Sequence, residues 1–464
     1  MRPDAVRRTE IRSERKETFT RQEDRRLRWS VLAMVSAALM TACGGSDNDP
    51  AQGSSLATPA AIDVPYTNGV ATTANPVAYW NKIATDTINV AATPGTGTPE
   101  EQRPVSAVDL ATVHVAMYDA VTAIVGTHEP FAVTVAGTPS AGASQEAAVA
   151  AAVYGVLKGL FPNRTAQYES AYDAFVADIP ADDARTRGLA IGAEAAAGIL
   201  ALRANDGRSA AVSFTPGTLP GQFRGVNPIG AFIPYIKPFT LQSASQFRAP
   251  PPPSLDSEEY AANFEEVLAV GGATSATRTA AWFEVARLHT ESPATFLPRN
   301  YRAFAMDGKS IADNARVMAM LWLAMADATI ACFETKYFYA FWRPVSAIAL
   351  ADTDGNPATV EDPAWAPSAP TPNHPEYPSA HLCVNGAAAT AMKYSFGTRL
   401  INYSFGSTVT GSVRQYPGPD AFLAETTEAR ILGGMHFRNS NLVGRELGTS
   451  VGEWVAKNYF RKKI

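Results

Sequence analysis

A long apolar run near the middle of the chain constrains the fold more than any other feature. Residues 309–350 read as one long helix or two abutting helices, and their central stretch, MAMLWLAMADATIACF, is apolar nearly all the way round. A helix without a polar face has to be buried on most of its sides. Charges such as Asp327 and Lys336 interrupt the run, so we do not expect it to cross a membrane. Other helices must therefore surround it.

The rest of the chain has the composition of a large helical protein. Its 464 residues are 46% hydrophobic and 18% charged, which suits one large domain or two closely packed ones. Two Gly- and Pro-rich stretches, 206–253 and 351–379, are predicted to be irregular, and 397–417 is predicted to form a short hairpin. Periodicity and breaker residues predict further helices over 77–91, 104–125, 143–160, 164–178, 182–204, 256–270, 276–290, 380–396, 420–436 and 442–460.

The N-terminal segment has the pattern of an export signal. Residues 1–43 carry ten Lys/Arg and six Asp/Glu, then an uncharged run from Trp29 that ends in small residues before Cys43. This pattern is similar to a bacterial lipoprotein signal and predicts a lipid anchor on Cys43 at the cell envelope or periplasm, or secretion. Residues 44–76 are polar and rich in Pro and Gly, as expected of a flexible linker.

Net charge argues against a nucleic-acid-binding protein. The whole chain carries −5, and because residues 1–43 contribute +4, the remainder carries −9. The two cysteines beyond Cys43, Cys332 and Cys383, lie in apolar helical segments and are expected to be buried free thiols. His114 is likewise expected to be a buried structural histidine that bonds a backbone group.

Basic and histidine residues recur at three places in the last third of the chain. Lys336 and Arg343 lie seven residues apart, two helical turns, so one helix face is expected to present both. The sequence Pro378-Ser379-Ala380-His381 opens an apolar helical segment, whose free N–H groups and Ser379 hydroxyl suit an anion. Arg430 and His436 follow at the end of another helical segment.

Together these residues suit one small, highly charged oxyanion. The guanidinium groups offer paired donors and the lysine a compact charge. One imidazole could bond the central atom, while the other gives or takes a proton at an apical oxygen.

The pattern resembles the vanadium-dependent haloperoxidase and type-2 phosphatidic acid phosphatase superfamily, whose signature reads K-x6-RP, PSGH and SR-x5-H. The resemblance implies an all-α fold of two packed four-helix-type bundles over residues 77–464, with the anion site in about 309–464. It implies that His436 bonds vanadium and that His381 is the acid–base residue. It also implies a vanadate cradle, for which phosphate can substitute, made by Lys336, Arg343, Ser379, Ala380 and Arg430.

Segments outside the signature extend this resemblance. Residues 109–122, 291–305 and 342–348 also look like bacterial vanadium haloperoxidases. The reaction implied is oxidation of a halide by hydrogen peroxide to hypohalous acid, with Lys336 polarising the peroxide and a small organic molecule as acceptor. An acid phosphatase with a phosphohistidine, or a non-catalytic phosphate- or vanadate-binding lipoprotein, remains an alternative. A homo-oligomer is compatible with the sequence.

Three positions depart from the family pattern. Ala380 replaces Gly, Ala429 replaces Ser, and Ser440 stands where an Asp commonly follows the ligand histidine by four residues. The missing Asp would orient the imidazole, so we expect His436 to be held less firmly and halogenation to be weaker.

Two residues bear on the choice of halide. His374 lies five residues before Ser379, where bromoperoxidases of the family carry a histidine and chloroperoxidases an aromatic residue. Phe333 falls where chloroperoxidases have an aromatic residue that shapes the halide pocket. We therefore expect His374 to act in catalysis and bromide or iodide to be oxidised in preference to chloride.

Overall fold

The computed structural model describes residues 74–396 and 403–463. The expected signal peptide, 1–43, with Cys43, and nearly all of the expected linker, 44–76, lie outside the described residues. The regular secondary structure of the described part is helical apart from one two-stranded hairpin, and the all-α prediction is therefore confirmed.

The first bundle is built around a helix with no exposed stripe. In helix α4 (Ser106–Val125) every residue from Val108 to Thr122 is buried. It packs against three neighbours of its own bundle, α2 (Pro76–Ile88), α5 (Gln145–Leu160) and α7 (Asp183–Arg203). The side chains of Ser144 and Asp182 accept backbone N–H groups at the starts of α5 and α7, which fixes where both helices begin.

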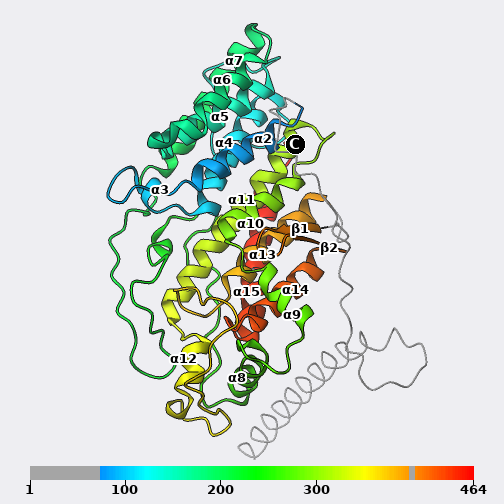
Figure 1. Cartoon of the computed structure of the whole chain (residues 1–464). Coiled ribbons are helices and arrows are strands. Elements are labelled where there is room, and N and C mark those ends of the chain that lie inside the picture. The colour runs from blue at the N-terminus through cyan, green and yellow to red at the C-terminus, as the bar shows by residue number, and fades with distance from the viewer. Residues whose placement is uncertain (1–73, 397–402, 464) are drawn as a thin grey trace, which may run out of the picture. The chain divides into compact units, whose positions relative to one another are not determined.

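The second bundle surrounds the long apolar helix that the sequence predicted. Helix α11 (Ile311–Tyr339) packs against α4 on one side and against two helices of the second bundle on the other, so it belongs to both cores (Figure 1). Its partners in the second bundle are α13 (Ala380–Phe396) and α15 (Arg438–Asn458), with α14 (Pro419–Leu432) packed beside them.

Glycines let α13 and α15 approach closely. Gly444, Gly448 and Gly452 recur every fourth residue along the face of α15 that meets α13. A Cβ atom at Gly448 would overlap the carbonyl oxygen of Cys383. The two backbones are therefore nearly in contact, which fixes the start of α13 against α15.

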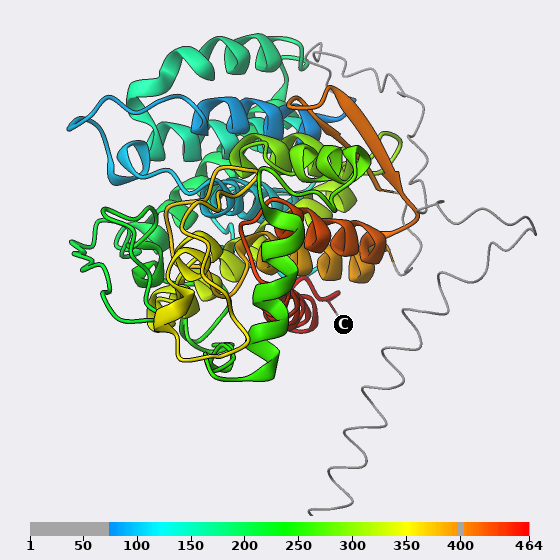
Figure 2. The same cartoon turned by 60° about the horizontal axis from the view of Figure 1, so that its bottom comes forward.

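The remaining elements cover the bundles. The hairpin expected within 397–417 is confirmed, with Tyr403 of one strand opposite Tyr416 of the other and α10 beside it (Figure 2). The elements are α3 (Pro99–Gln102), η1 (Pro162–Gln167), α6 (Glu169–Ala177), η2 (Ile233–Tyr235), α8 (Glu258–Gly271), α9 (Ala280–Leu288), α10 (Pro293–Tyr301), η3 (Arg302–Phe304), α12 (Pro344–Ala349), η4 (Ala351–Thr353), β1 (Tyr403–Ser407) and β2 (Ser412–Tyr416).

Two helices of the described chain are long and apolar enough to cross a membrane. They are α4 and α11, and 83% and 89% of their apolar windows are buried inside the protein. Such burial is typical of core helices, in agreement with the expectation for residues 309–350.

The segment 309–350, predicted as one long helix or two abutting helices, forms two helices, α11 and α12, separated by residues 340–343. Helix α11 ends at Tyr339, and Ala340 adopts a left-handed conformation with φ 46°. Pro344 then starts α12 and disfavours a helical conformation at Arg343, which is extended at φ −85° and ψ 156°. The prediction that one helix face presents Lys336 and Arg343 is therefore wrong.

Two further helix predictions need correction. The helix predicted over 420–436 ends at Leu432, and Gly434 turns the chain at φ 69°, so His436 lies in the connection before α15. Helix α10 was not predicted, because Pro298 inside it reads as a helix breaker.

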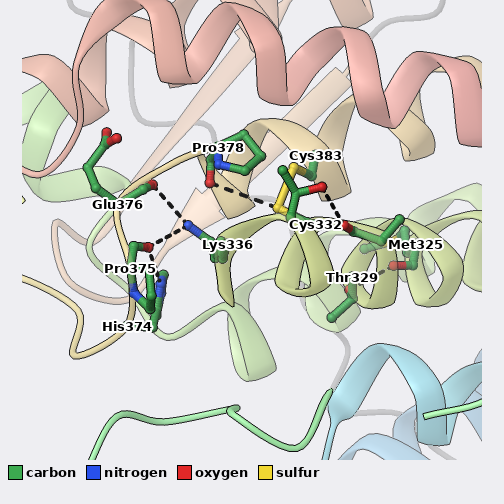
Figure 3. Close-up of a disulfide and its surroundings, with 11 residues drawn as sticks. Met325, Thr329, Cys332, Lys336, His374, Pro375, Glu376, Pro378 and Cys383 are labelled. Atoms are coloured by element: carbon green, nitrogen blue, oxygen red, sulfur yellow. Dashed lines mark hydrogen bonds between the residues drawn. A yellow bond between two sulfur atoms is a disulfide. The ribbon is translucent and has the colours of Figure 1, made fainter. Parts of the chain in front are cut away.

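The expectation of free thiols is also wrong. Cys332 of α11 and Cys383 of α13 form a disulfide, with their Cα atoms 6.2 Å apart (Figure 3). Cys332 lies one helical turn before Lys336, and Cys383 lies two residues after His381. The covalent link therefore joins the two helices beside two of the predicted site residues.

Candidate active site

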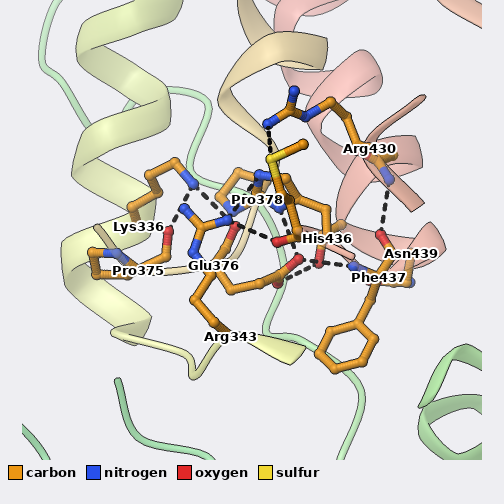
Figure 4. Close-up of polar contacts among 12 residues, drawn as sticks. Lys336, Arg343, Pro375, Glu376, Pro378, Arg430, His436, Phe437 and Asn439 are labelled. Carbon is orange, nitrogen blue, oxygen red and sulfur yellow. Dashed lines mark hydrogen bonds and ion pairs between the residues drawn. The ribbon is translucent and has the colours of Figure 1, made fainter. Parts of the chain in front are cut away.

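Lys336 lies in the last turn of α11 and is completely buried. Its Nζ atom donates to the carbonyl oxygens of Pro375 and Glu376, at 2.9 and 3.0 Å (Figure 4). The Pro-rich segment before α13 therefore folds back over the end of α11 and fixes the ammonium group.

Arg343 lies between α11 and α12 and connects three parts of the site. Its Nε atom donates to the carbonyl oxygen of His374 at 2.9 Å, and Nη2 lies 3.0 Å from His374 Nδ1. Its Nη1 atom donates to the carbonyl oxygen of Met435 at 2.8 Å and lies 3.1 Å from His436 Nε2. The interruption between α11 and α12 thus brings Arg343 toward Lys336, and the two side chains do not share a helix face.

The start of α13 supplies the second part of the site. Ser379 is fully buried, and its N–H donates to the carbonyl oxygen of Ser440 at 2.9 Å. Its hydroxyl has no hydrogen-bond partner within the described chain. Ala380 and His381, the first residues of α13, line the adjoining cavity.

Arg430 supplies the third part, from the last turn of α14. Its Nη1 atom donates to the carbonyl oxygen of His289 at 3.0 Å, and Nη2 contacts the sulfur of Met435 at 2.8 Å. Its Nε atom is buried and finds no partner among the described residues. A thioether is a weak acceptor, so this guanidinium retains donor capacity for an anion.

A carboxylate that the sequence interpretation missed lies against His436. Glu376 is fully buried, and its Oε1 lies 2.8 Å from His436 Nδ1 and accepts the N–H of Phe437 at 3.0 Å. Its Oε2 accepts the Ser440 hydroxyl at 2.6 Å. The expectation that replacing the family's Asp by Ser440 leaves His436 without a carboxylate is therefore wrong. The proximity of Glu376 to His374 and Ser379 in sequence was the signal available.

The electrostatics of the site favour an anion. Burial lowers the pKa of Lys336 well below its ordinary value, and the charge of Arg343 adds to the effect. Burial lowers the pKa of Arg343 to about 10, and burial with the charge of Arg343 lowers that of Arg430 to about 9. Three buried cations are thus set against one adjoining carboxylate in the described chain, Glu376, and burying such an excess of charge is costly.

The histidines of the site are neutral without an anion. Burial and the neighbouring cations hold the pKa values of His374, His381 and His436 well below the ordinary histidine value. Neutral imidazole has a free lone pair, so each ring can accept a proton or bond an electron-poor atom.

A cavity of about 520 Å³ opens onto these groups. The ring of His374 faces it and lies beside that of Phe333, with ring centroids 5.3 Å apart. Apolar side chains form much of the wall, among them Ile233, Leu297 and Trp322. The polar residues of this wall include His374, His381, Arg430 and His436.

The donors of the site fit vanadate. The uncommitted Ser379 hydroxyl and Arg430 Nε atom, the excess of buried positive charge and the neutral His436 are the partners that an oxyanion with an electrophilic centre requires. Ala380 retains its backbone N–H despite replacing a glycine. The fold and site together define a class: helical-bundle proteins in which buried cations gather around a neutral histidine.

Comparison with known proteins relates the second bundle to a described domain family. Residues 316–462 match the family described as the VCPO second helical-bundle domain. Vanadium chloroperoxidase of Curvularia inaequalis is 28% identical over 218 residues, which are 38% of this chain and 35% of that protein. Both matches are therefore likenesses of part of the chain, and the family model covers the second bundle.

Solved structures share the fold over most of the chain. A structure described as the first bacterial vanadium-dependent iodoperoxidase covers 84% of this chain and 97% of its own, with a TM-score of 0.67 and 22% identity. A holo-type bacterial vanadium-dependent chloroperoxidase covers 82% of this chain and 96% of its own, with a TM-score of 0.64 and 16% identity. The likeness confirms the expected fold.

Proposed function

We propose that the protein is a vanadate-dependent haloperoxidase that oxidises bromide or iodide with hydrogen peroxide to hypohalous acid. The observation that carries the proposal is the contact between Arg343 and Nε2 of the neutral His436, in a site that also contains buried Lys336 and Arg430. The names of the similar proteins support this reaction over others that the same site chemistry allows.

The residues that would hold vanadate are Lys336, Arg343, Ser379, Ala380 and Arg430, with His436 as the direct ligand. When bound, vanadate supplies a Lewis acid that activates peroxide. The chain contributes fixed positive charge that stabilises negative oxygen atoms. Its cationic side chains need not reorganise when the anion binds, because backbone carbonyls already hold them.

His381 would handle protons. Its pKa is held well below the ordinary value, first by burial and then by the charge of Arg430, so it begins as a base in the anion-free site. It lines the cavity with His374, so a peroxide arriving there can give a proton to His381. Lys336 would polarise the peroxide through its charge, and the apolar wall would admit a small organic acceptor.

The N-terminal sequence and one disulfide bear on the environment in which the protein works. We propose export to the cell envelope or periplasm with a lipid anchor on Cys43, or secretion, and the disulfide Cys332–Cys383 supports an oxidising compartment.

The test compares two forms of the same protein. The vanadate-loaded form is assayed with peroxide and bromide, iodide or chloride, using a halogen acceptor dye. The vanadate-free form is assayed with p-nitrophenyl phosphate. Halide oxidation that depends on both vanadate and peroxide, and is lost in His436→Ala, is the expected result. Phosphatase activity alone would establish the acid phosphatase instead, and anion binding without either activity would establish a binding lipoprotein.

A further inference from the structure

We propose that Glu376 of the loop before α13 is the positioning residue that fixes the tautomer of His436, and that a carboxylate at position 440 can take over this role. This inference rests on the proposed role of His436 as the direct ligand. Its consequence is that one carboxylate, at either position 376 or position 440, must lie beside the imidazole of His436.

The tautomer follows from the two neighbours of the imidazole. A guanidinium can only donate, so Arg343 Nη1, at 3.1 Å, requires His436 Nε2 to accept. The proton of the neutral ring then lies on Nδ1, where Glu376 Oε1 accepts it at 2.8 Å. Both contacts favour the same tautomer, and that tautomer directs the Nε2 lone pair toward the cations.

Glu376 is itself held from both ends. Its side chain accepts the N–H of Phe437 and the hydroxyl of Ser440. Its main chain donates to the carbonyl oxygen of Phe341, and its own carbonyl accepts Lys336 Nζ. Burial raises its pKa, while the Ser440 hydrogen bond and the charges of Arg343 and Lys336 oppose that shift. Three donors, from His436, Phe437 and Ser440, therefore fix the position of this carboxylate.

Ser440 sits one helical turn beyond His436, at the start of α15, and its hydroxyl lies 2.6 Å from Glu376 Oε2. An aspartate there would bring a second buried carboxylate against the first, and two such groups cannot both ionise at that separation. An aspartate at 440 with no acid at 376 would instead place one carboxylate beside the imidazole. Either position can therefore supply the carboxylate. We expect vanadate binding to weaken when both positions are acidic and when neither is.

The first measurement is equilibrium binding of vanadate and of inorganic phosphate to the anion-free protein. Glu376→Gln keeps the shape and should weaken vanadate binding by about 10- to 100-fold, because the ligand histidine loses basicity. Phosphate, held by the cations alone, should change much less. Glu446→Gln, on an exposed position of α15, is the matched control and should leave both affinities unchanged.

The second measurement is rescue. Glu376→Ala and Ser440→Asp should each bind vanadate less tightly than the parent, and the double variant Glu376→Ala/Ser440→Asp should bind it more tightly than either. The proposal would be overturned if the double variant bound vanadate no more tightly than the two single variants. It would also be overturned if Glu376→Gln left the ratio of vanadate to phosphate affinity unchanged.

Proton NMR of the anion-free protein tests the same inference without vanadate. The Nδ1 proton of His436 should give a far-downfield signal in the parent, typical of an imidazole bonded to a carboxylate, and Glu376→Gln should move it upfield. An unmoved signal would contradict the assignment. Because none of these readouts involves turnover, absence of halide oxidation would refute the proposed function and leave this inference to be judged by binding and NMR.

Discussion

The guanidinium of Arg343 lies against the imidazole of His436, with Nη1 3.1 Å from Nε2, although the two residues are separated by 93 positions in the chain. The contact places a permanent cation beside the atom that is expected to bond vanadium. Burial and this positive neighbour lower the pKa of that imidazole and keep it neutral, so its Nε2 lone pair accepts the Arg343 hydrogen bond until an oxyanion displaces it.

Replacing His436 by Ala should abolish tight vanadate binding. The expected loss is at least about 100-fold in affinity, because the direct bond to the metal disappears while the cradle of cations persists. Binding is measured by equilibrium titration of the anion-free protein, with His128→Ala, in a half-buried segment bridged to Lys462, as the control. Vanadate binding as tight as in the parent would show that His436 is not the ligand.

An oxyanion should stabilise the fold, and Arg430 should be needed for that effect. Phosphate or vanadate at 100 times its dissociation constant should add about 2.7 kcal/mol to the free energy of unfolding. Arg430→Met should lose most of this gain yet remain folded without anion, because removing one buried cation relieves repulsion from Arg343. Urea unfolding with and without anion measures both effects.

The control for that experiment is Arg445→Met, which removes an arginine that pairs with Asp420 at the protein surface. It should keep the full stabilisation by anion. Equal stabilisation of the parent and Arg430→Met would contradict a role for Arg430 in the cradle.

Replacing His374 by Phe should shift halide preference. The backbone carbonyl that accepts Arg343 Nε is retained, so the cradle should survive. The ring loses its contact with Arg343 Nη2, and the cavity gains an aromatic wall beside Phe333. We expect the chloride-to-bromide rate ratio or the pH optimum to change, the ratio by about fivefold, the worth of one hydrogen bond. An unchanged ratio and pH profile with vanadate bound would make His374 structural.

His114 should make the protein sensitive to acid. It is buried and bonded to the Asn81 side chain at 2.9 Å, rather than to the backbone as expected, and burial lowers its pKa to about 3. As the pH falls below about 6.5 the unfolded chain takes up a proton that the folded chain refuses, so stability is lost by about 1.4 kcal/mol per pH unit.

His114→Gln should remove this contribution. The difference in unfolding free energy between pH 7 and pH 5 should shrink by about 2 kcal/mol, measured by urea unfolding at both values. The same pH dependence in parent and variant would mean that His114 takes up a proton in the folded state.

The disulfide should contribute to stability. Closing a loop with a sequence separation of 51 residues is worth about 4 kcal/mol when the cross-link restricts the unfolded chain. The double variant Cys332→Ser/Cys383→Ser should therefore unfold at lower urea concentration than the parent, with a reductant lowering the parent toward it. A reductant-insensitive parent would contradict the cystine.

The sequence predicted the helices well where apolar periodicity is long and uninterrupted, as in α4, α5 and α11. It failed at Ala340, where a left-handed residue ends α11, because tertiary contacts rather than propensity select that conformation. The disulfide was missed because the pairing depends on how α11 packs on α13, which no spacing of two cysteines reveals.

The site residues could be proposed only because they match a family signature. In the structure five of them line one cavity, and Arg343 contacts one of these five, His436; the five are His374, Ala380, His381, Arg430 and His436. Glu376 was not predicted as a site residue, because a single acidic residue in a Pro-rich loop belongs to no periodic pattern. Its importance depends on the path of the loop, which returns over Lys336 and reaches His436.

The contact between Arg430 and the sulfur of Met435 bears on how long the protein can work. Met435 is the one thioether among the described residues that line the cavity. Under the proposed function, each turnover brings an oxidant to that wall, and oxygen transfer to the sulfur would yield a bulkier, polar sulfoxide beside the cradle. Oxidation of Met435 would then limit the number of turnovers that the protein completes before its own product disables it.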